Sequence, residues 1–182
     1  MDKKWIKDGV FASSVIDLNG RKVSNPTDEY LIAAGYKEYQ EPVPTEAEKL
    51  EWAKADKIDE IEQYDNSPSV NSFTLNGKRR WLKNDLRRSL SYSTNILKED
   101  GEKTVDIWFD TECETMNIDN ALYMLKELEV YAKQTNNVTH QHKAEVMALT
   151  SIEEVEAYDI TKDYPEKLVF SNEKLSEAVS NI

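Results

Sequence analysis

The stretch that predicts the fold class reads VNSFTLNGKRRWL, from Val70 to Leu82. At its centre is Asn76-Gly77, a pair that favours the two positive φ angles of a tight hairpin turn. A second Asn-Gly pair, at residues 19–20, follows the strand-like residues 10–18. Helical patterns lie between and after these hairpins. We therefore expect an α+β fold in which short β-hairpins pack with four to five helices.

Working outward from Leu82, leucines fall near helical spacing. They place Leu82, Leu86, Leu90 and Leu97 on the buried side of a helix that Asn84 or Asp85 caps. A strand is expected at 104–109, with a short partner at 116–118. Asp119 is expected to cap the clearest helix, in which Leu122, Leu125 and Leu128 should pack on a sheet that contains Phe73, Trp81, Ile107 and Phe109.

The remaining elements are predicted from caps and short apolar runs. A separate helix is expected over 138–149. A capping box at Thr150 and Glu153 should start a short helix, and a last strand is expected at 168–170. Near the N-terminus, Asn25-Pro26 should open a helix that ends at Gly35.

Four segments follow from these patterns. Residues 1–40 form a small N-terminal hairpin-helix unit for attachment, and the proline-bounded residues 40–44 mark a boundary. Residues 41–56 are a linker and charged helix, opened by a capping box of Thr45 and Glu48. The first half of this helix is charged all round, so we expect it to cross solvent between packed regions. Residues 57–170 are the main α+β domain, and 171–182 are a loosely held C-terminal tail.

Composition excludes several classes of protein. The chain has 182 residues and a net charge of −12, the opposite sign to that of a general nucleic-acid binder. No apolar run approaches the roughly 18 residues of a membrane helix, and no secretory signal is recognised. One cysteine among 182 residues allows no internal disulfide and fits a reducing compartment. The five glycines form no phosphate-binding loop, so we expect no cofactor and no enzyme activity.

Three groups of residues are candidates for chemical sites. On a helix His142 and Glu145 could share a metal ion, but His140 would point elsewhere, so a solvated or capping role is favoured. The acidic residues Asp110, Glu112 and Glu114 lack the spacing of a calcium loop and suit a solvated hairpin tip. Cys113 lies among them, where a thiol pKa should rise. No metal ligand or catalytic residue is therefore predicted.

Cations cluster in one short segment. It runs from residue 78 to 88, carries a net charge of +5 and leaves −17 for the rest of the chain. A solvated strand edge, a protein interface and a nucleic-acid site all remain open, with nucleic acid the least favoured. Within this segment we predict an interface through Arg79, Arg80, Arg87 and Arg88. Trp81 lies among them as a core residue or an interface anchor.

Aromatic residues cluster in the first 40 residues. A unit of this size buries little core by itself, so its aromatic side chains should pack on a neighbour. The neighbour is either the rest of this chain or another subunit, and the proline-bounded connector favours another subunit. The predicted interface residues here are Trp5, Phe11, Tyr30, Tyr36 and Tyr39.

One resemblance gives these patterns a context. Tyr64 to Gly77, then Trp81-Leu82 and Arg87, resemble the core pattern of an uncharacterised domain family of tailed phages and prophages, often encoded near tail-fibre genes. The likeness extends over residues 57–170. It implies a non-enzymatic virion structural protein, made in the host bacterial cytoplasm and associated with the tail, a fibre or the head. The alternative is a tail-fibre assembly chaperone that is absent from the mature particle.

The resemblance also implies the kind of partner. The expected partners are other phage structural proteins, with a homo-oligomer possible, no membrane, and nucleic acid disfavoured. The family has no catalytic motif to carry over to this sequence.

Overall fold

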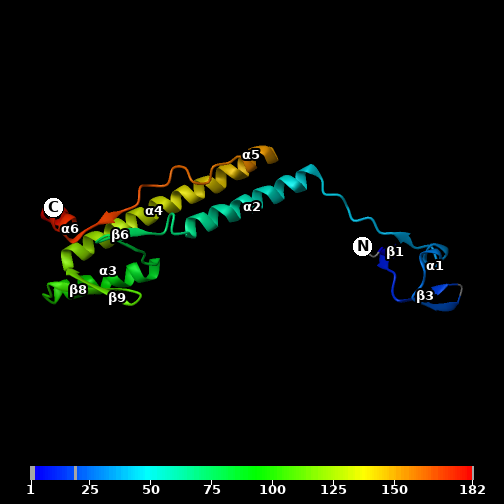
Figure 1. Ribbon diagram of the computed structural model, residues 1–182, viewed down its shortest axis with the longest axis horizontal. Helices are drawn as coiled ribbons and strands as arrows, with labels where there is room; N and C mark the ends of the chain where they lie inside the picture. Colours follow the sequence, from blue (N-terminus) through cyan, green and yellow to red (C-terminus); the bar gives the residue numbers. More distant parts are fainter. Residues whose placement is uncertain (1–2, 19, 182) are drawn as a thin grey trace. The chain divides into compact units, whose positions relative to one another are not determined.

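The structure is a computed structural model that describes residues 3–18 and 20–181. It has the expected α+β fold, with six helices and ten short strands in the described residues (Figure 1). The chain divides into two compact units between Thr45 and Glu46. The boundaries drawn from the sequence, at 40/41 and 56/57, differ because residues 46–66 form one helix that belongs to the second unit.

The N-terminal unit folds around a small core of its own. Strand β1 (Trp5–Lys7) pairs antiparallel with β2 (Val10–Phe11) on one edge and with β5 (Lys37–Glu38) on the other. Strands β3 (Val15–Leu18) and β4 (Arg21–Ser24) form a separate hairpin, and α1 (Asp28–Ala33) follows it. The buried core residues come from β1, β3 and the α1 region: Trp5, Ile16, Leu31 and Ala34.

The expected hairpin and helix of this unit are confirmed, with two corrections. Leu18 pairs with Arg21, so the turn has two residues, of which Asn19 lies outside the described residues. The strand expected over 10–18 is two strands, β2 and β3. Helix α1 begins at Asp28 and not at Pro26, because Thr27 is extended, with a ψ of 165°, and forms the N-cap.

In the second unit, α2 (Glu46–Asn66) lies antiparallel to the second half of α4 (Ile118–Ala148), as Figure 1 shows. The short helix α5 (Ile152–Glu156) closes this group, whose core is Ile61, Val146 and Val155. The first half of α2 does not cross solvent as expected. Leu50 and Ala53 pack against that core, and Lys54 is buried, with its Nζ donating to the Met147 carbonyl at 3.1 Å.

Helix α4 corrects the prediction of two helices, because it runs unbroken for 31 residues. The polar residues 134–137 contain neither Gly nor Pro. Its buried positions also continue at spacings of three and four across that stretch, which keeps one face of the helix in contact with its neighbours. They are Leu128, Tyr131, Thr135, Thr139, His142 and Val146. The cap is Asn117, whose side chain accepts from the Asp119 N–H, and not Asp119 itself.

Two hairpins complete the second unit. In β6 (Phe73–Leu75) and β7 (Lys78–Arg80), Asn76 and Gly77 have φ values of 49° and 77°, as the tight turn requires. Strand β10 (Val169–Phe170), close to the expected last strand, adds to β6 in parallel. The second hairpin joins β8 (Thr104–Phe109) to β9 (Glu112–Asn117), which is longer than the partner expected at 116–118.

The main core lies between these hairpins and the first half of α4. Leu125 and Leu128 are fully buried there with Phe73, Ile107 and Phe109, and Leu122 and Trp81 pack against them. The predicted packing of the leucine stripe is thus confirmed. The aromatic and aliphatic partners come from two separate sheets, however, and not from a single one.

Helix α3 (Asn84–Glu99) confirms the expected buried side in part: Leu82, just before the helix, is in the main core, and Leu90 and Leu97 pack against it, but Leu86 does not. Leu86 is exposed, Leu90 and Leu97 are half-buried, and the fully buried helical positions are Arg87 and Thr94. The residue at the N-cap is Lys83, with no side-chain hydrogen bond, and not Asn84 or Asp85. Leucine spacing misplaced Leu86 and did not predict the burial of Arg87, because that burial depends on the Leu82 carbonyl and the Trp81 ring.

The C-terminal segments bring two more corrections. The capping box of α5 is formed by Ser151 and Glu154, one residue later than expected. Residues 171–182 are not a loose tail: α6 (Asn172–Ser180) packs Leu175, 1% exposed, into the main core. A single apolar residue per turn gave too weak a sequence pattern to predict this. Within the described residues, no helix has both the length and the apolar character to cross a membrane.

Candidate functional site

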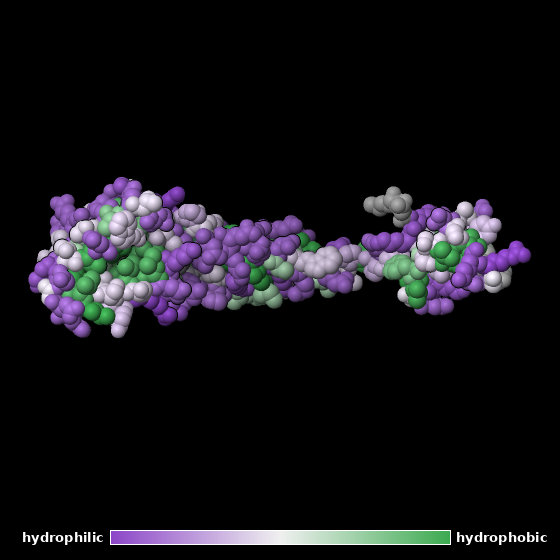
Figure 2. All heavy atoms as spheres, turned by 90° about the horizontal axis from the view of Figure 1, so that it is seen from below, coloured by the Kyte–Doolittle hydropathy of each residue, from purple (hydrophilic) through white to green (hydrophobic). Residues whose placement is uncertain are grey.

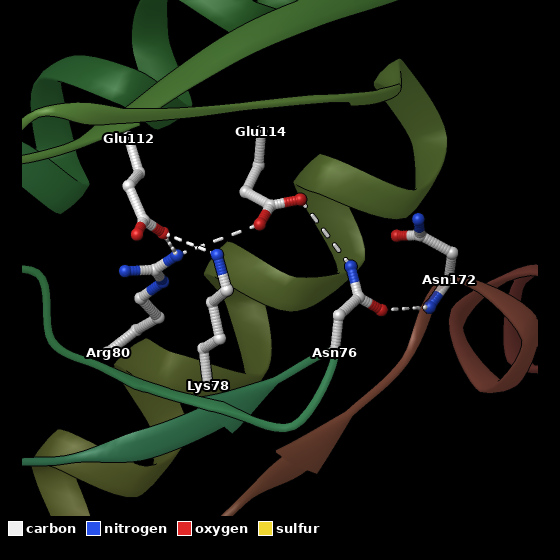
Figure 3. A network of polar contacts seen from close by, with 6 residues as sticks. All are labelled: Asn76, Lys78, Arg80, Glu112, Glu114 and Asn172. Atoms are coloured by element: carbon white, nitrogen blue, oxygen red, sulfur yellow. Dashed lines mark hydrogen bonds and ion pairs between the residues drawn. The ribbon is translucent and has the colours of Figure 1, made fainter.

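The basic segment does not form one continuous surface. Lys78 and Arg80 turn towards β9, where both pair with Glu112, the lysine at 2.8 Å, and Arg80 also lies 3.7 Å from Glu114 (Figure 3). The hydrogen bonds from Arg80 and Lys78 lower the pKa of Glu112 from its usual 4.5 to about 2. Arg80, predicted as an interface residue, therefore holds two hairpins of the same unit together.

Asn76, in the β6–β7 turn, extends this network. Its amide lies 3.5 Å from Glu114, and its side-chain oxygen accepts from the Asn172 backbone N–H at 3.0 Å (Figure 3). The same turn residue thus connects the second hairpin and the start of α6. The acidic residues of the β8–β9 hairpin were expected to be solvated, but two of them are neutralised by cations that lie 32 to 34 positions earlier in the chain.

Arg87 is also engaged internally. It is only 4% exposed, its Nη1 donates to the Leu82 carbonyl at 2.6 Å, and its Nε lies 3.4 Å from Glu129. Its guanidinium lies 5.2 Å from the centre of the Trp81 ring. A side chain so enclosed offers a partner little surface, which disfavours the predicted interface role. Arg87 instead fixes the position of Trp81.

Trp81 and Arg87 form one side of a pocket of about 700 Å³, which we call the Trp81 pocket. The start of α3 and the middle of α4 contribute four cations to its lining: Lys83, Arg87, Arg88 and Lys133. The end of α2 supplies Asp65 and Asn66 to the lining, and the loop after it supplies Pro68 and Asn71. Three segments far apart in the sequence therefore meet at this pocket.

The loop wall of the pocket is held by hydrogen bonds. The Ser67 hydroxyl donates to the Tyr64 carbonyl at 2.7 Å, and the Asn71 N–H donates to the Ser67 carbonyl at 2.8 Å. The Tyr131 hydroxyl, from α4, donates to the Val70 carbonyl at 2.9 Å, and its ring meets Trp81 edge-on. The loop after α2, Trp81 and the middle of α4 thus meet at one site.

Sequence reasoning missed Lys133 and the asparagines of this pocket. Lys133 is about 45 residues away from the other cations in sequence, and only the packing of α4 brings it near them. Asn71, Asn84 and Asn136 are ordinary loop or helix residues by pattern. No periodicity or motif could have grouped them before the fold was known.

A second pocket, of about 460 Å³, shares the Trp81 wall and opens towards β8. Arg79, which is exposed, lines this pocket together with Leu86 and with Trp108, which is 58% exposed. In Figure 2 hydrophobic residues gather on the surface of the second unit, and the exposed aliphatic side chains of α3 are Leu86 and Ile96. Arg79 and Arg88 are the two predicted cations that remain accessible.

The predicted aromatic residues of the N-terminal unit divide into two groups. Trp5 is buried in the unit's own core and Tyr36 packs against it, so neither is a free anchor. Phe11 and Tyr30 are about half exposed, and Phe11 meets Tyr39 edge-on at 5.1 Å. The accessible aromatic surface of this unit is therefore carried by Phe11, Tyr30 and Tyr39.

His142 is neither solvated nor a cap. It is buried, with Nδ1 2.7 Å from the Tyr158 hydroxyl, Nε2 3.0 Å from the Lys162 carbonyl, and its ring stacked on Tyr164. Tyr158 donates onward to Glu145 at 2.6 Å, and this bond, with those from Gln141 and Lys162, lowers the Glu145 pKa to about 2. This network ties the segment after α5 to α4.

Among the described residues, no group of three or more His, Cys, Asp or Glu side chains could hold a metal ion. Cys113 is exposed, and partial desolvation, with the charges of Asp106 and Glu114, raises its pKa.

Comparisons with protein-family models, with curated proteins and with solved structures found no match to this chain. The Trp81 pocket is therefore interpreted from its own chemistry.

Proposed function

We propose that this chain is a non-enzymatic structural protein of a bacteriophage virion, associated with the tail or a fibre or decorating the head. It acts by docking onto other phage structural proteins. The docking part of the proposal rests on one observation: the chain has two units, each with its own core, joined by a segment that contains Pro42 and Pro44. The viral context rests on the resemblance of residues 57–170.

Two separate units on one chain suit a protein that attaches through one and presents the other. The N-terminal unit carries accessible apolar side chains on a small scaffold, among them Val10, Phe11, Tyr30 and Ile32. Exposed aromatic and aliphatic side chains on so small a unit favour contact with another protein surface. We assign attachment to this unit and presentation to residues 46–182.

The test is the composition of the particles made by the genome that encodes this chain. Quantitative mass spectrometry of purified particles should find the chain at a fixed ratio to the other structural proteins. A chain that begins at Glu46 should fold but be missing from the particles. A double variant, Phe11→Ser with Tyr30→Ser, should reduce incorporation, and Val43→Ser, an exposed connector change, serves as its control.

Two outcomes would change the proposal. If the full chain is absent from particles but copurifies with newly made fibre protein, it is an assembly chaperone. If the chain that begins at Glu46 is incorporated as well as the full chain, the N-terminal unit is not the attachment unit.

A further inference from the structure

The Trp81 pocket holds cations that the protein itself does not neutralise. Across residues 3–18 and 20–181, Lys83, Arg88 and Lys133 form no salt bridge, and all three are exposed at the pocket. Two carboxylates also line the pocket, but Asp65 accepts from Thr139 and Glu129 lies against Arg87, so neither pairs with these three cations. Such a concentration attracts an anionic group and orients it.

Neutral hydrogen-bond donors at the same pocket also favour an anionic group. The side-chain amides of Asn71, Asn84 and Asn136 line it, and none has a hydrogen-bond partner within the described part of the chain. The first turn of α3, a 16-residue helix, begins here after Lys83 without a side-chain cap. Its free N–H groups add positive potential to that of the three cations.

We infer that the Trp81 pocket binds an acidic segment of a protein partner, whose carboxylates are held by Lys83, Arg88 and Lys133. This inference rests on the proposed docking function and names the chemistry of one partner. Trp81 and Pro68 supply apolar contact, and the asparagine amides donate to carboxylate or backbone oxygens.

The charges around the pocket favour a short acidic peptide over a nucleic acid. Outside residues 78–88 the chain carries a net charge of −17, which repels an extended polyanion but not a segment confined to one pocket. A volume of about 700 Å³ accommodates a few side chains. Arg87 already lies over the Trp81 ring, so this indole is not a free platform for stacking a base.

Binding is tested on the full chain with a fluorescein-labelled peptide of eight glutamates, measured by fluorescence anisotropy at low and high salt. A peptide of eight glutamines and a labelled single-stranded DNA of ten nucleotides serve as comparison probes. The glutamate peptide should bind, the glutamine peptide should not, and the affinity should fall as salt rises.

The variant that isolates the pocket is Lys83→Gln with Arg88→Gln and Lys133→Gln. Its matched control is Lys22→Gln with Lys103→Gln and Lys174→Gln, which removes the same charge from exposed cations outside the pocket. Three exposed ion pairs together change a dissociation constant by about tenfold. The pocket variant should therefore bind the glutamate peptide about tenfold more weakly than the original chain does. The control should bind like the original chain.

The position of binding is read from the four tryptophan indole N–H signals in a proton–nitrogen NMR spectrum. The Trp81 signal, assigned with a Trp81→Phe variant, should shift on adding the glutamate peptide, while that of Trp5 should not. This readout depends on location and not on net charge, and unchanged dispersion of the spectrum shows that the pocket variant is folded.

Three results would overturn the inference: no binding of the glutamate peptide, equal loss in the pocket and control variants, or tighter binding of the DNA than of the peptide. The last would identify a nucleic acid as the partner. These results are separate from the composition of the particles, so the pocket can fail while the proposed virion function stands, and the reverse.

Discussion

At the scale of single residues, the arginines of one short segment have different roles. Arg80 is paired with two glutamates, Arg87 is buried against Trp81, and Arg79 and Arg88 remain accessible. Identical side chains differ because the alternation of β7 and the turn of α3 direct them to different surroundings. Charge reversal at Arg80 would therefore report on folding, and only Arg79 and Arg88 can report on docking.

Arg87 gives the sharpest stability prediction at this scale. Arg87→Ala removes the donor to the Leu82 carbonyl and the cation above Trp81, and it leaves a gap where the side chain packed. We expect a loss of about 2 kcal/mol in the free energy of unfolding. Urea unfolding followed by circular dichroism measures it. Arg88→Ala, one position along, should stay within about 0.5 kcal/mol, and equal effects of the two would contradict the buried role.

Glu112 predicts how stability depends on pH. Its pKa in the folded chain is about 2, below the usual 4.5, so its ion pairs stabilise the fold above pH 4.5. That contribution is lost as the pH falls from 4.5 towards 2. Glu112→Gln should therefore be less stable than the original chain at pH 7, with the difference shrinking towards zero near pH 2. Thermal unfolding across this range measures it, and a difference independent of pH would be inconsistent with the pairing.

At the scale of elements, α4 organises the second unit. Its first half forms one wall of the main core, and its second half packs on α2 and α5. The buried polar positions of the second half are satisfied by hydrogen bonds: Thr139 donates to Asp65 at 2.8 Å, and His142 meets Tyr158 and Lys162. Polar residues at buried helical spacing thus select the neighbours of this helix.

The two histidines of α4 test that role. His142→Ala removes two buried hydrogen bonds and a stacked ring, so we expect a loss of about 2–4 kcal/mol in the free energy of unfolding. His140→Ala, on an exposed position of the same helix, should change it by less than about 0.5 kcal/mol. Urea unfolding at pH 7 compares them. A destabilised His140 variant with an unaffected His142 variant would show that the helix face is wrongly assigned.

At the scale of the whole molecule, the two units have separate cores. Each of the three core clusters draws its residues from one unit, so removing one unit should leave the cores of the other intact. A chain of residues 46–182 should unfold in urea with a free energy of unfolding within about 0.5 kcal/mol of that of the corresponding transition in the full chain. Limited proteolysis should cut the full chain first within residues 40–45. A truncated chain that does not fold would mean that the units depend on each other.

The sequence by itself determined the local elements, because local signals are enough to define them. The Asn76-Gly77 hairpin, the leucine stripe of α4, the α+β class and a division near the prolines all follow from turn chemistry and apolar spacing. Each of these features depends on residues that are close to one another in the sequence.

Only the tertiary structure decided which polar residues are buried and which cations are free. The continuity of α4 through Thr135, the burial of Arg87 and His142, and the docking of α6 by Leu175 depend on partners distant in sequence. The Trp81 pocket likewise exists only where α3, α4 and the loop after α2 meet. A polar side chain is buried when a distant group satisfies its hydrogen bonds, and no local pattern carries that information.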